Sequence, residues 1–182
     1  MPRLILVRHG RAASGWGDHL DPGLDQLGHA QARAAADALA DLGPLPIVVS
    51  PLRRTRETAQ PLEARWGVEA RVEPAVGEVR SPVPDLSARV EWLREFMVST
   101  WDAQPPALLE WRDDLIGALL ALEEDTVVFT HFVAINAAVG VATNDARVTC
   151  FAPDHCSRST FESDGERLIL LGAGDEAQTR VL

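Results

Sequence analysis

Three short apolar segments of this sequence end on side chains that could bind an anion and react with it. Arg8 and His9 follow the segment LILV, the stretch SPLRRTRETA (50–59) follows PIVV, and His131 follows TVVFT. An arginine guanidinium binds phosphate or carboxylate through paired hydrogen bonds, and a neutral imidazole is a nucleophile. Arginines buried at strand ends are costly unless an anion lies between them. The pattern therefore predicts an anion site at these strand ends, with two histidines beside it.

The elements that would position these residues are strands of one sheet. Apolar runs alternate with stretches of helical periodicity, which is typical of an α/β fold with parallel strands. We expect strands at 4–7, 46–50, 68–74, 126–130, 147–151, 158–163 and 167–172, and helices at 24–43, 52–67, 85–101, 107–125 and 133–141. The prediction is one domain, 1–182, built as a three-layer α/β/α sandwich. Its sheet is mostly parallel but mixed, because the turn SDGE favours a closing hairpin.

Ligands of such sheets bind beyond the carboxyl ends of the strands. The histidines and arginines listed above all follow strands, so we expect them to meet at that edge. Gly10 is expected to let the backbone approach the ligand closely. Pro61 predicts a kink or a break in the helix 52–67.

Four segments resemble, in the right order, the motifs of the histidine phosphatase superfamily, which has the phosphoglycerate-mutase-like fold. They are LVRHGRA, LDPGLDQLGHAQA, SPLRRTRETA and VVFTHF. Thr55 stands where the family usually has Ala, Gly23 and Asp25 depart from its helix-start pattern, and Phe132 replaces a usual Gly. The loop 10–23 lacks the Glu-Ser and Asn pattern of glycolytic mutases, and the chain is shorter than those enzymes. Both points favour a phosphatase over a mutase.

The resemblance implies a role for each residue at the strand ends. His9 would be the nucleophile that takes the phosphoryl group, while Arg8, Arg54 and His131 would hold the phosphate. Counting along the second motif puts the family's arginine at Arg54, and Arg53 is then expected to lie on the surface.

The family's proton donor is a Glu or Asp between the second motif and the late histidine. Glu78, in AVGEVRSP, is the best candidate, and Glu73 and Asp85 remain alternatives. A carboxyl group with a raised pKa can protonate a leaving alkoxide and then, as a carboxylate, activate water. In the segment 79–104, next to Glu78, we expect a lid or a specificity element.

Physical chemistry sets conditions on His9. Its imidazole must be neutral to attack phosphorus, and the positive charges of Arg8 and Arg54 disfavour the protonated form. A backbone carbonyl at the other ring nitrogen would fix the tautomer. Guanidinium groups can neutralise a transferred phosphoryl group without a metal and would repel a cation beside His9 and His131. We therefore expect neither a metal nor any other cofactor.

The composition narrows the partners and the compartment. The 182 residues carry a net charge of −10, which disfavours nucleic acid and anionic membrane surfaces. All 17 basic residues are arginines, which removes Schiff-base and phosphate-loop lysine chemistry. No apolar run approaches the ~20 residues of a membrane span, and Cys150 and Cys156 match no zinc or redox spacing. These features predict a cytoplasmic protein, and they leave the oligomeric state open.

Three further residues are given simpler roles. His19 and His155 are expected to be polar loop residues, although His155 could line the edge of the site. Phe132 is expected to pack in the core between a strand and a helix.

The sequence thus predicts a metal-independent phosphomonoester hydrolase that forms a phosphohistidine. Its substrate would be a small phosphorylated metabolite or a phosphoprotein. One alternative is a mutase-like phosphotransferase. The other is a non-catalytic phosphate-binding regulatory module.

Overall fold

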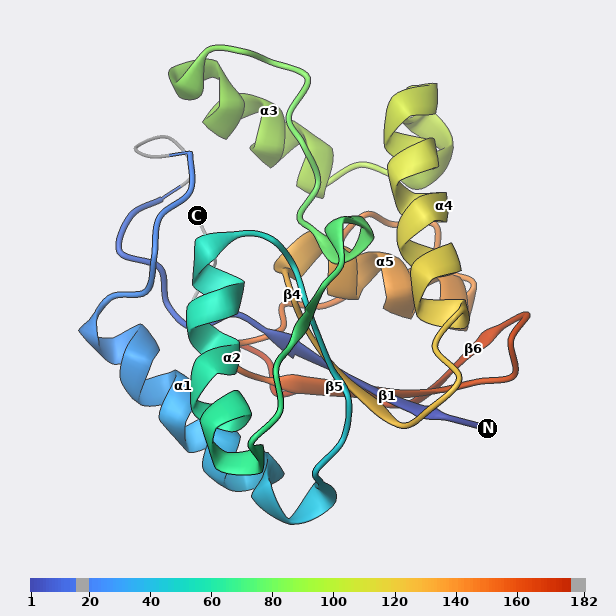
Figure 1. The fold of residues 1–182 in the computed structure, drawn as a ribbon. Coiled ribbons are helices and arrows are strands. Elements are labelled where there is room, and N and C mark those ends of the chain that lie inside the picture. Colours follow the sequence, from blue (N-terminus) through green and yellow to red (C-terminus); the bar gives the residue numbers. More distant parts are fainter. Residues whose placement is uncertain (16–19, 178–182) are drawn as a thin grey trace.

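A six-stranded sheet organises the chain in the computed structural model, which describes residues 1–15 and 20–177 (Figure 1). The expectation for His19 therefore lies outside the described residues. The strands are β1 (Arg3–Arg8), β2 (Ile47–Val49), β3 (Arg71–Val72), β4 (Thr126–Thr130), β5 (Arg158–Ser163) and β6 (Leu168–Gly172). Their order is β3-β2-β4-β1-β5-β6. The first four are mutually parallel, whereas β5 is antiparallel to both β1 and β6. The predicted mostly parallel mixed sheet is confirmed.

Helices cover both faces of the sheet, which gives the predicted three layers (Figure 1). The helices are α1 (Gln26–Leu39), α2 (Arg53–Trp66), α3 (Leu86–Met97), α4 (Pro106–Leu120) and α5 (Phe132–Thr143), with short 3-10 turns η1 (Ala40–Leu42), η2 (Pro74–Val76) and η3 (Trp101–Ala103). Alternate residues of β1 point to opposite faces. Ile5 and Val7 pack with residues of α1 and α2, whereas Leu4 and Leu6 pack with residues of α3, α4 and α5.

Local signals in the sequence explain where several elements begin and end. Asp25 caps α1 by accepting the N–H of Gly28 at 2.7 Å, and Asp85 caps α3 in the same way. Gly67 ends α2 in the left-handed conformation, with φ of +66°. The SDGE turn joins β5 to β6 as predicted, with Gly165 at φ of +87°. None of the helices in the described ranges is long and apolar enough to cross a bilayer.

One prediction about local structure is wrong. The segment 147–151 is not a strand, because the side-chain oxygen of Asn136 accepts the N–H groups of Cys150 and Phe151 at 2.7 and 3.1 Å. These backbone donors are therefore not available to a neighbouring strand. Of the kink or break predicted at Pro61, the break is absent: α2 is one continuous helix, held against the sheet by Ala59 and Leu62.

The segment 68–74 is shorter as a strand than predicted. Only Arg71–Val72 pairs with β2, at the edge of the sheet. The chain then turns at Pro74, which has no N–H to continue a ladder, into η2. This turn leads directly to Glu78.

Candidate active site

The carboxyl ends of β1, β2 and β4 bring the predicted residues together. The N–H of His9 donates to the carbonyl of Thr130 at 3.1 Å, and that of Ser50 donates to the carbonyl of Phe129 at 3.1 Å. The rings of His9 and His131 consequently lie with their centroids 5.3 Å apart. Since both histidines sit on a three-strand scaffold, their relative position is set by the sheet rather than by loops.

His9 is held as a neutral imidazole in one tautomer. Its Nδ1 lies 2.7 Å from the carbonyl oxygen of Gly10. A carbonyl can only accept, so Nδ1 carries the ring proton and Nε2 has the free lone pair. Burial holds the pKa of His9 well below its usual 6.5, and the positive charges of Arg54 and Arg8 lower it further. Both conditions predicted for a histidine nucleophile are met.

Gly10 has a packing role that the sequence did not indicate. A Cβ on Gly10 would lie 2.7 Å from the carbonyl oxygen of Gly28, in the first turn of α1. The glycine is therefore needed for the close approach of α1 to the loop after β1, and its expected approach to a ligand stays a prediction. The N–H of Gly10 also donates to the hydroxyl of Thr58 on α2, at 3.0 Å.

Two buried guanidinium groups flank His9. Arg8 is 4 % exposed and donates to the carbonyl of Pro153 at 2.7 Å, while its Nε has no partner among the described residues. Burial lowers the pKa of Arg8 to about 10 and also lowers that of Arg54. Arg54 comes from the first turn of α2, whereas its neighbour Arg53 faces solvent and pairs with Glu57 at 2.6 Å. The arginine chosen by counting along the motif is the one that faces the site.

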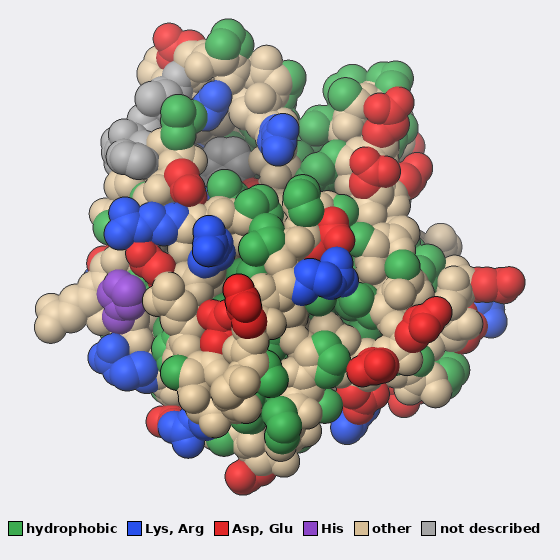
Figure 2. Space-filling model, in the orientation of Figure 1, with side chains coloured by type: hydrophobic (Ala, Val, Ile, Leu, Met, Phe, Trp, Pro, Cys, Tyr) green, Lys and Arg blue, Asp and Glu red, His purple; other side chains and the backbone are tan. Residues whose placement is uncertain are grey.

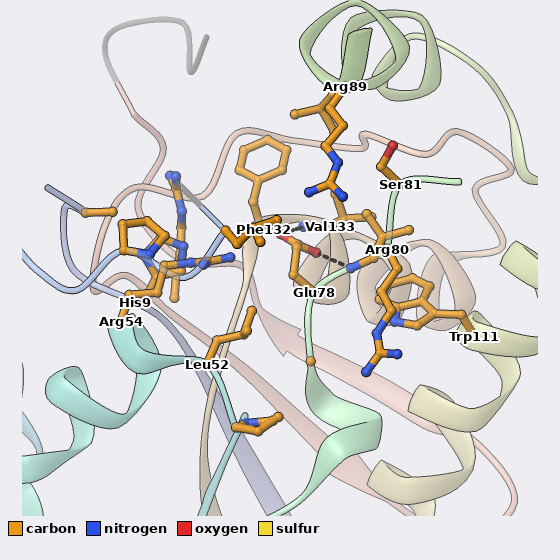
Figure 3. Close-up of a pocket in the computed structure, with 18 of the residues that line it drawn as sticks. His9, Leu52, Arg54, Glu78, Arg80, Ser81, Arg89, Trp111, Phe132 and Val133 are labelled. Carbon is orange, nitrogen blue, oxygen red and sulfur yellow. Dashed lines mark hydrogen bonds between the residues drawn. The ribbon is translucent and has the colours of Figure 1, made fainter. Parts of the chain in front are cut away.

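Glu78 lies at the same site, just after η2 (Figure 3). Its two carboxylate oxygens accept the N–H groups of Val79 at 3.0 Å and of Val133, in the first turn of α5, at 3.2 Å. Burial nevertheless raises the pKa of Glu78, since it outweighs these hydrogen bonds and the charges of Arg54 and Arg8. A buried carboxyl group of this kind is suited to donate a proton.

The two alternative carboxylates are engaged elsewhere. Glu73 accepts the N–H of Ala75 and pairs with Arg71 at 2.9 Å. Asp85 caps α3, and its hydrogen bonds to Ser87 and Ala88 lower its pKa. The lowered pKa of Asp85 keeps that carboxyl group ionised at neutral pH, and the Glu73 carboxylate is held by Ala75 and Arg71.

His131 is more enclosed than the sequence suggested. It has no exposed surface and does not line the cleft described below. Its Nε2 lies 2.8 Å from the hydroxyl of Ser50, while its Nδ1 has no partner among the described residues. Burial holds the pKa of His131 well below 6.5, so this ring is also neutral.

A cleft of about 1430 Å³ opens above these residues. Arg8, His9, Arg54 and Glu78 line one end of it, and α3 and α4 line the other. The surface is visibly hollowed between these two helices (Figure 2). The segment 79–104 therefore forms a wall of the cleft, where a specificity element was expected.

His155 lies in a loop, as expected, and it also lines the cleft, the alternative that the sequence left open. Its ring centroid lies 6.0 Å from that of His9, and it lines the cleft. Burial lowers its pKa to about 4, with a further contribution from Arg8. The backbone explains this position, because the N–H of Cys156 donates to the carbonyl of Arg8 at 3.0 Å. This contact between distant segments has no local signal in the sequence.

The sequence profile of the histidine phosphatase superfamily (branch 1) matches residues 4–176. The chain belongs to this superfamily. Similar curated proteins include the glucosyl-3-phosphoglycerate phosphatases of Mycolicibacterium vanbaalenii (36 % identical over 116 residues, 62 % of this chain and 48 % of the relative) and Mycobacterium tuberculosis (34 % over 133 residues, 71 % and 51 %). The chain thus spans about half the length of the curated relatives it matches. A mycobacterial glucosyl-3-phosphoglycerate phosphatase structure in complex with VO3 matches with a TM-score of 0.72 at 24 % identity, covering 99 % of this chain and 100 % of that one.

Phe132 departs from the motif of the superfamily, and the structure gives it two contacts. It belongs to the core cluster on the α5 side of the sheet, as predicted. Its ring also lines the cleft, and the guanidinium carbon of Arg8 lies 5.2 Å from the ring centroid. A cation over an aromatic face is attracted to it. Phe132 therefore helps to hold the Arg8 side chain in place.

The site is a poor match for a cation. Within residues 1–15 and 20–177, no group of three or more His, Cys, Asp or Glu side chains is arranged to bind a metal. Arg8 and Arg54 bring two positive charges next to the histidine pair. The same charges favour an anion.

Proposed function

We propose that this protein is a metal-independent phosphomonoester hydrolase that forms a phosphohistidine on His9. The observation that carries the proposal is the neutral His9 ring, whose Nε2 is free because Nδ1 donates to the carbonyl of Gly10. This nucleophile lies between two buried guanidinium groups, in a cleft that also contains a carboxyl group with a raised pKa. Membership of the histidine phosphatase superfamily supports the same chemistry.

In the first step, Nε2 of His9 attacks the phosphorus and the bond to the alcohol oxygen breaks. Arg8 and Arg54 offset the charge on the phosphoryl oxygens, and Glu78 gives its proton to the leaving alkoxide. In the second step, the Glu78 carboxylate takes a proton from water as the water attacks phospho-His9. Inorganic phosphate leaves, and Glu78 is protonated again.

For His131 we propose a contact with the phosphate through Nδ1, the ring nitrogen without a partner among the described residues. Because His131 has no exposed surface, this contact requires the side chains above it to move apart when phosphate enters. The Nε of Arg8, which also has no partner among the described residues, supports the same proposal.

We propose a small phosphorylated metabolite as the substrate, in preference to a phosphoprotein. The curated relatives named above are phosphatases of such a metabolite, glucosyl-3-phosphoglycerate. A phosphotransferase of the mutase type is the second candidate, because it would use the same first step. Stoichiometric release of inorganic phosphate, with no transfer to an added acceptor, separates the two.

The test is whether the purified protein forms a phosphohistidine during turnover. Rapid acid-free quenching with an aryl phosphate, followed by mass spectrometry, should place one phosphoryl group on His9. The variant His9→Ala should lose both the phosphoenzyme and at least about 10³-fold of the activity, while His29→Ala, a surface control, should retain both. Full turnover by His9→Ala would refute the mechanism. A wild-type protein that binds phosphate but releases none from any ester would point to a regulatory module.

A further inference from the structure

Besides the two buried guanidinium groups beside His9, the cleft is lined by an arginine of its α3 wall. Arg89 lies in the first turns of α3, is half-buried and lines the cleft. Its Nε donates to the carbonyl of Val83 at 3.1 Å, which fixes the direction of the side chain. Figure 3 shows the guanidinium group pointing from α3 into the cavity, toward Glu78. Its two terminal nitrogens therefore face the space that the alcohol part of a substrate would occupy.

Most arginines on the surface of this acidic chain are neutralised by carboxylates. The ion pairs of the described residues include Arg3–Asp125, Arg11–Asp25, Arg53–Glu57, Arg65–Asp37 and Arg147–Asp145. Arg89 has no ion pair among the described residues, although the chain carries a net charge of −10. An arginine held toward a cavity without a carboxylate partner is suited to bind an anionic group of a ligand.

The two helical walls of the cleft differ in charge. Arg89 stands on the same face of α3 as Leu93 and Met97, since these residues are spaced four apart. The facing positions of α4 are Glu110, Trp111 and Asp114. An anionic group would be repelled by the carboxylates of α4 and attracted by Arg89. The two walls therefore favour a bound molecule whose anionic group faces α3.

We propose that Arg89 binds a second anionic group, carried by the alcohol part of the substrate. The preferred substrates are then phosphate esters of hydroxy acids rather than of neutral alcohols. The proposal rests on the hydrolase function proposed above and adds the charge of the leaving alcohol to it. Arg80, the neighbouring cleft arginine, is exposed and points away from Arg89 in Figure 3, so it is not part of this subsite.

Matched substrates isolate the second charge. The esters 3-phosphoglycerate and glycerol 3-phosphate differ only in a carboxylate at the far carbon, and 6-phosphogluconate and glucitol 6-phosphate form a longer pair of the same kind. For at least one pair, we expect the wild-type kcat/KM to favour the acid by about tenfold or more, the effect of one charge-assisted hydrogen bond. The difference should appear mainly in KM, because Arg89 holds the ground state and transition state alike.

Variants of α3 assign the preference to Arg89. Arg89→Met should reduce the ratio of kcat/KM for the acid to kcat/KM for the neutral ester toward one. Arg89→Lys should keep part of the preference for the acid. Arg94→Met removes an exposed arginine of the same helix that does not line the cleft, and it should leave the ratio unchanged. Equal melting temperatures for the four proteins exclude a folding defect as the cause.

Two results would overturn the proposal. One is a wild-type protein whose kcat/KM shows no preference in either pair. The other is an Arg89→Met variant in which kcat/KM falls by the same factor for the acid and for the neutral ester. If no ester is hydrolysed at all, the hydrolase function fails instead. Calorimetric binding of the same matched pairs then decides the role of Arg89 independently, and equal affinity for acid and neutral ester counts against it.

Discussion

The hydroxyl group of Ser50 lies 2.8 Å from Nε2 of His131 and also accepts the N–H of Leu52 at 3.3 Å. The hydroxyl makes no other hydrogen bond among the described residues, so we propose that it donates its proton to His131. Nε2 is then the acceptor, and Nδ1 carries the ring proton. Ser50 thereby prepares His131 to donate from Nδ1, which is the contact that we propose for the phosphate.

Replacing Ser50 tests this arrangement. Ser50→Ala leaves both ring nitrogens of a fully buried histidine without a partner and should lower the free energy of unfolding by about 1–3 kcal/mol. Urea denaturation measures the change. The control Ser157→Ala removes a buried hydroxyl that has no partner among the described residues, and it should be neutral or slightly stabilising. Equal losses in the two variants would argue against the Ser50–His131 bond.

The raised pKa of Glu78 predicts a pH dependence of catalysis. Burial favours the protonated carboxyl group, so the proton donor for the first step is lost as the pH rises through that raised pKa. For an alkyl phosphate, kcat/KM should fall as the pH rises through this pKa, and Glu78→Gln should lower kcat/KM by about 10²–10⁴-fold. With an aryl phosphate as substrate, Glu78→Gln should lower kcat/KM less, because a phenolate leaving group departs without a proton. Glu73→Gln is the control, and a profile unchanged by Glu78→Gln would remove Glu78 from the mechanism.

The buried histidines predict that the fold loses stability in acid. The pKa values of His9 and His131 are held well below 6.5 in the folded state by burial and by Arg54. The unfolded chain therefore binds these protons first as the pH falls below about 6.5, and each histidine contributes a loss of at most about 1.4 kcal/mol per pH unit. Their contribution is fully present above pH 6.5. Urea denaturation between pH 7.5 and 5 should show a smaller slope for His131→Gln than for the wild type, while His29→Gln, at the surface, should keep the wild-type slope.

The charges of the site predict insensitivity to chelators. Arg8 and Arg54 disfavour a cation beside His9, so dialysis against EDTA should change kcat by less than about twofold. Vanadate or tungstate should inhibit strongly, since these anions fit between the two guanidinium groups. Loss of activity in EDTA that is restored by a particular divalent metal would contradict the proposed mechanism.

Most strands could be predicted because their signals are local. The segments around β1, β2 and β4 are continuous apolar runs, as expected for strands buried on both faces, and β5 and β6 are separated by a recognisable turn. The segment 147–151, RVTCF, alternates polar and apolar residues over its first four positions, which is also typical of a strand. It does not form a strand because the N–H groups of Cys150 and Phe151 donate to the side-chain oxygen of Asn136, in α5.

The site could be predicted only in part, for a similar reason. His9 and Arg54 belong to contiguous motifs that indicate their chemistry directly. The position of His155 depends on a tertiary contact between its loop and the backbone of Arg8, and the direction of Arg89 depends on a side-chain bond to the carbonyl of Val83. The complete burial of His131 likewise results from what is packed over it and not from its neighbours in the sequence.

The residues at the strand ends are separate from the α3–α4 wall of the cleft, and this separation affects how the substrate specificity of the protein can evolve. The groups proposed for the chemistry lie at the ends of β1 and β4, at the start of α2 and just after η2, whereas the far wall of the cleft comes largely from the continuous stretch 79–114. Substitutions in that stretch can alter which alcohol is accepted while the phosphate-binding end is left intact. The fold is therefore well arranged for new specificities to evolve, or to be engineered by exchanging this one segment between relatives.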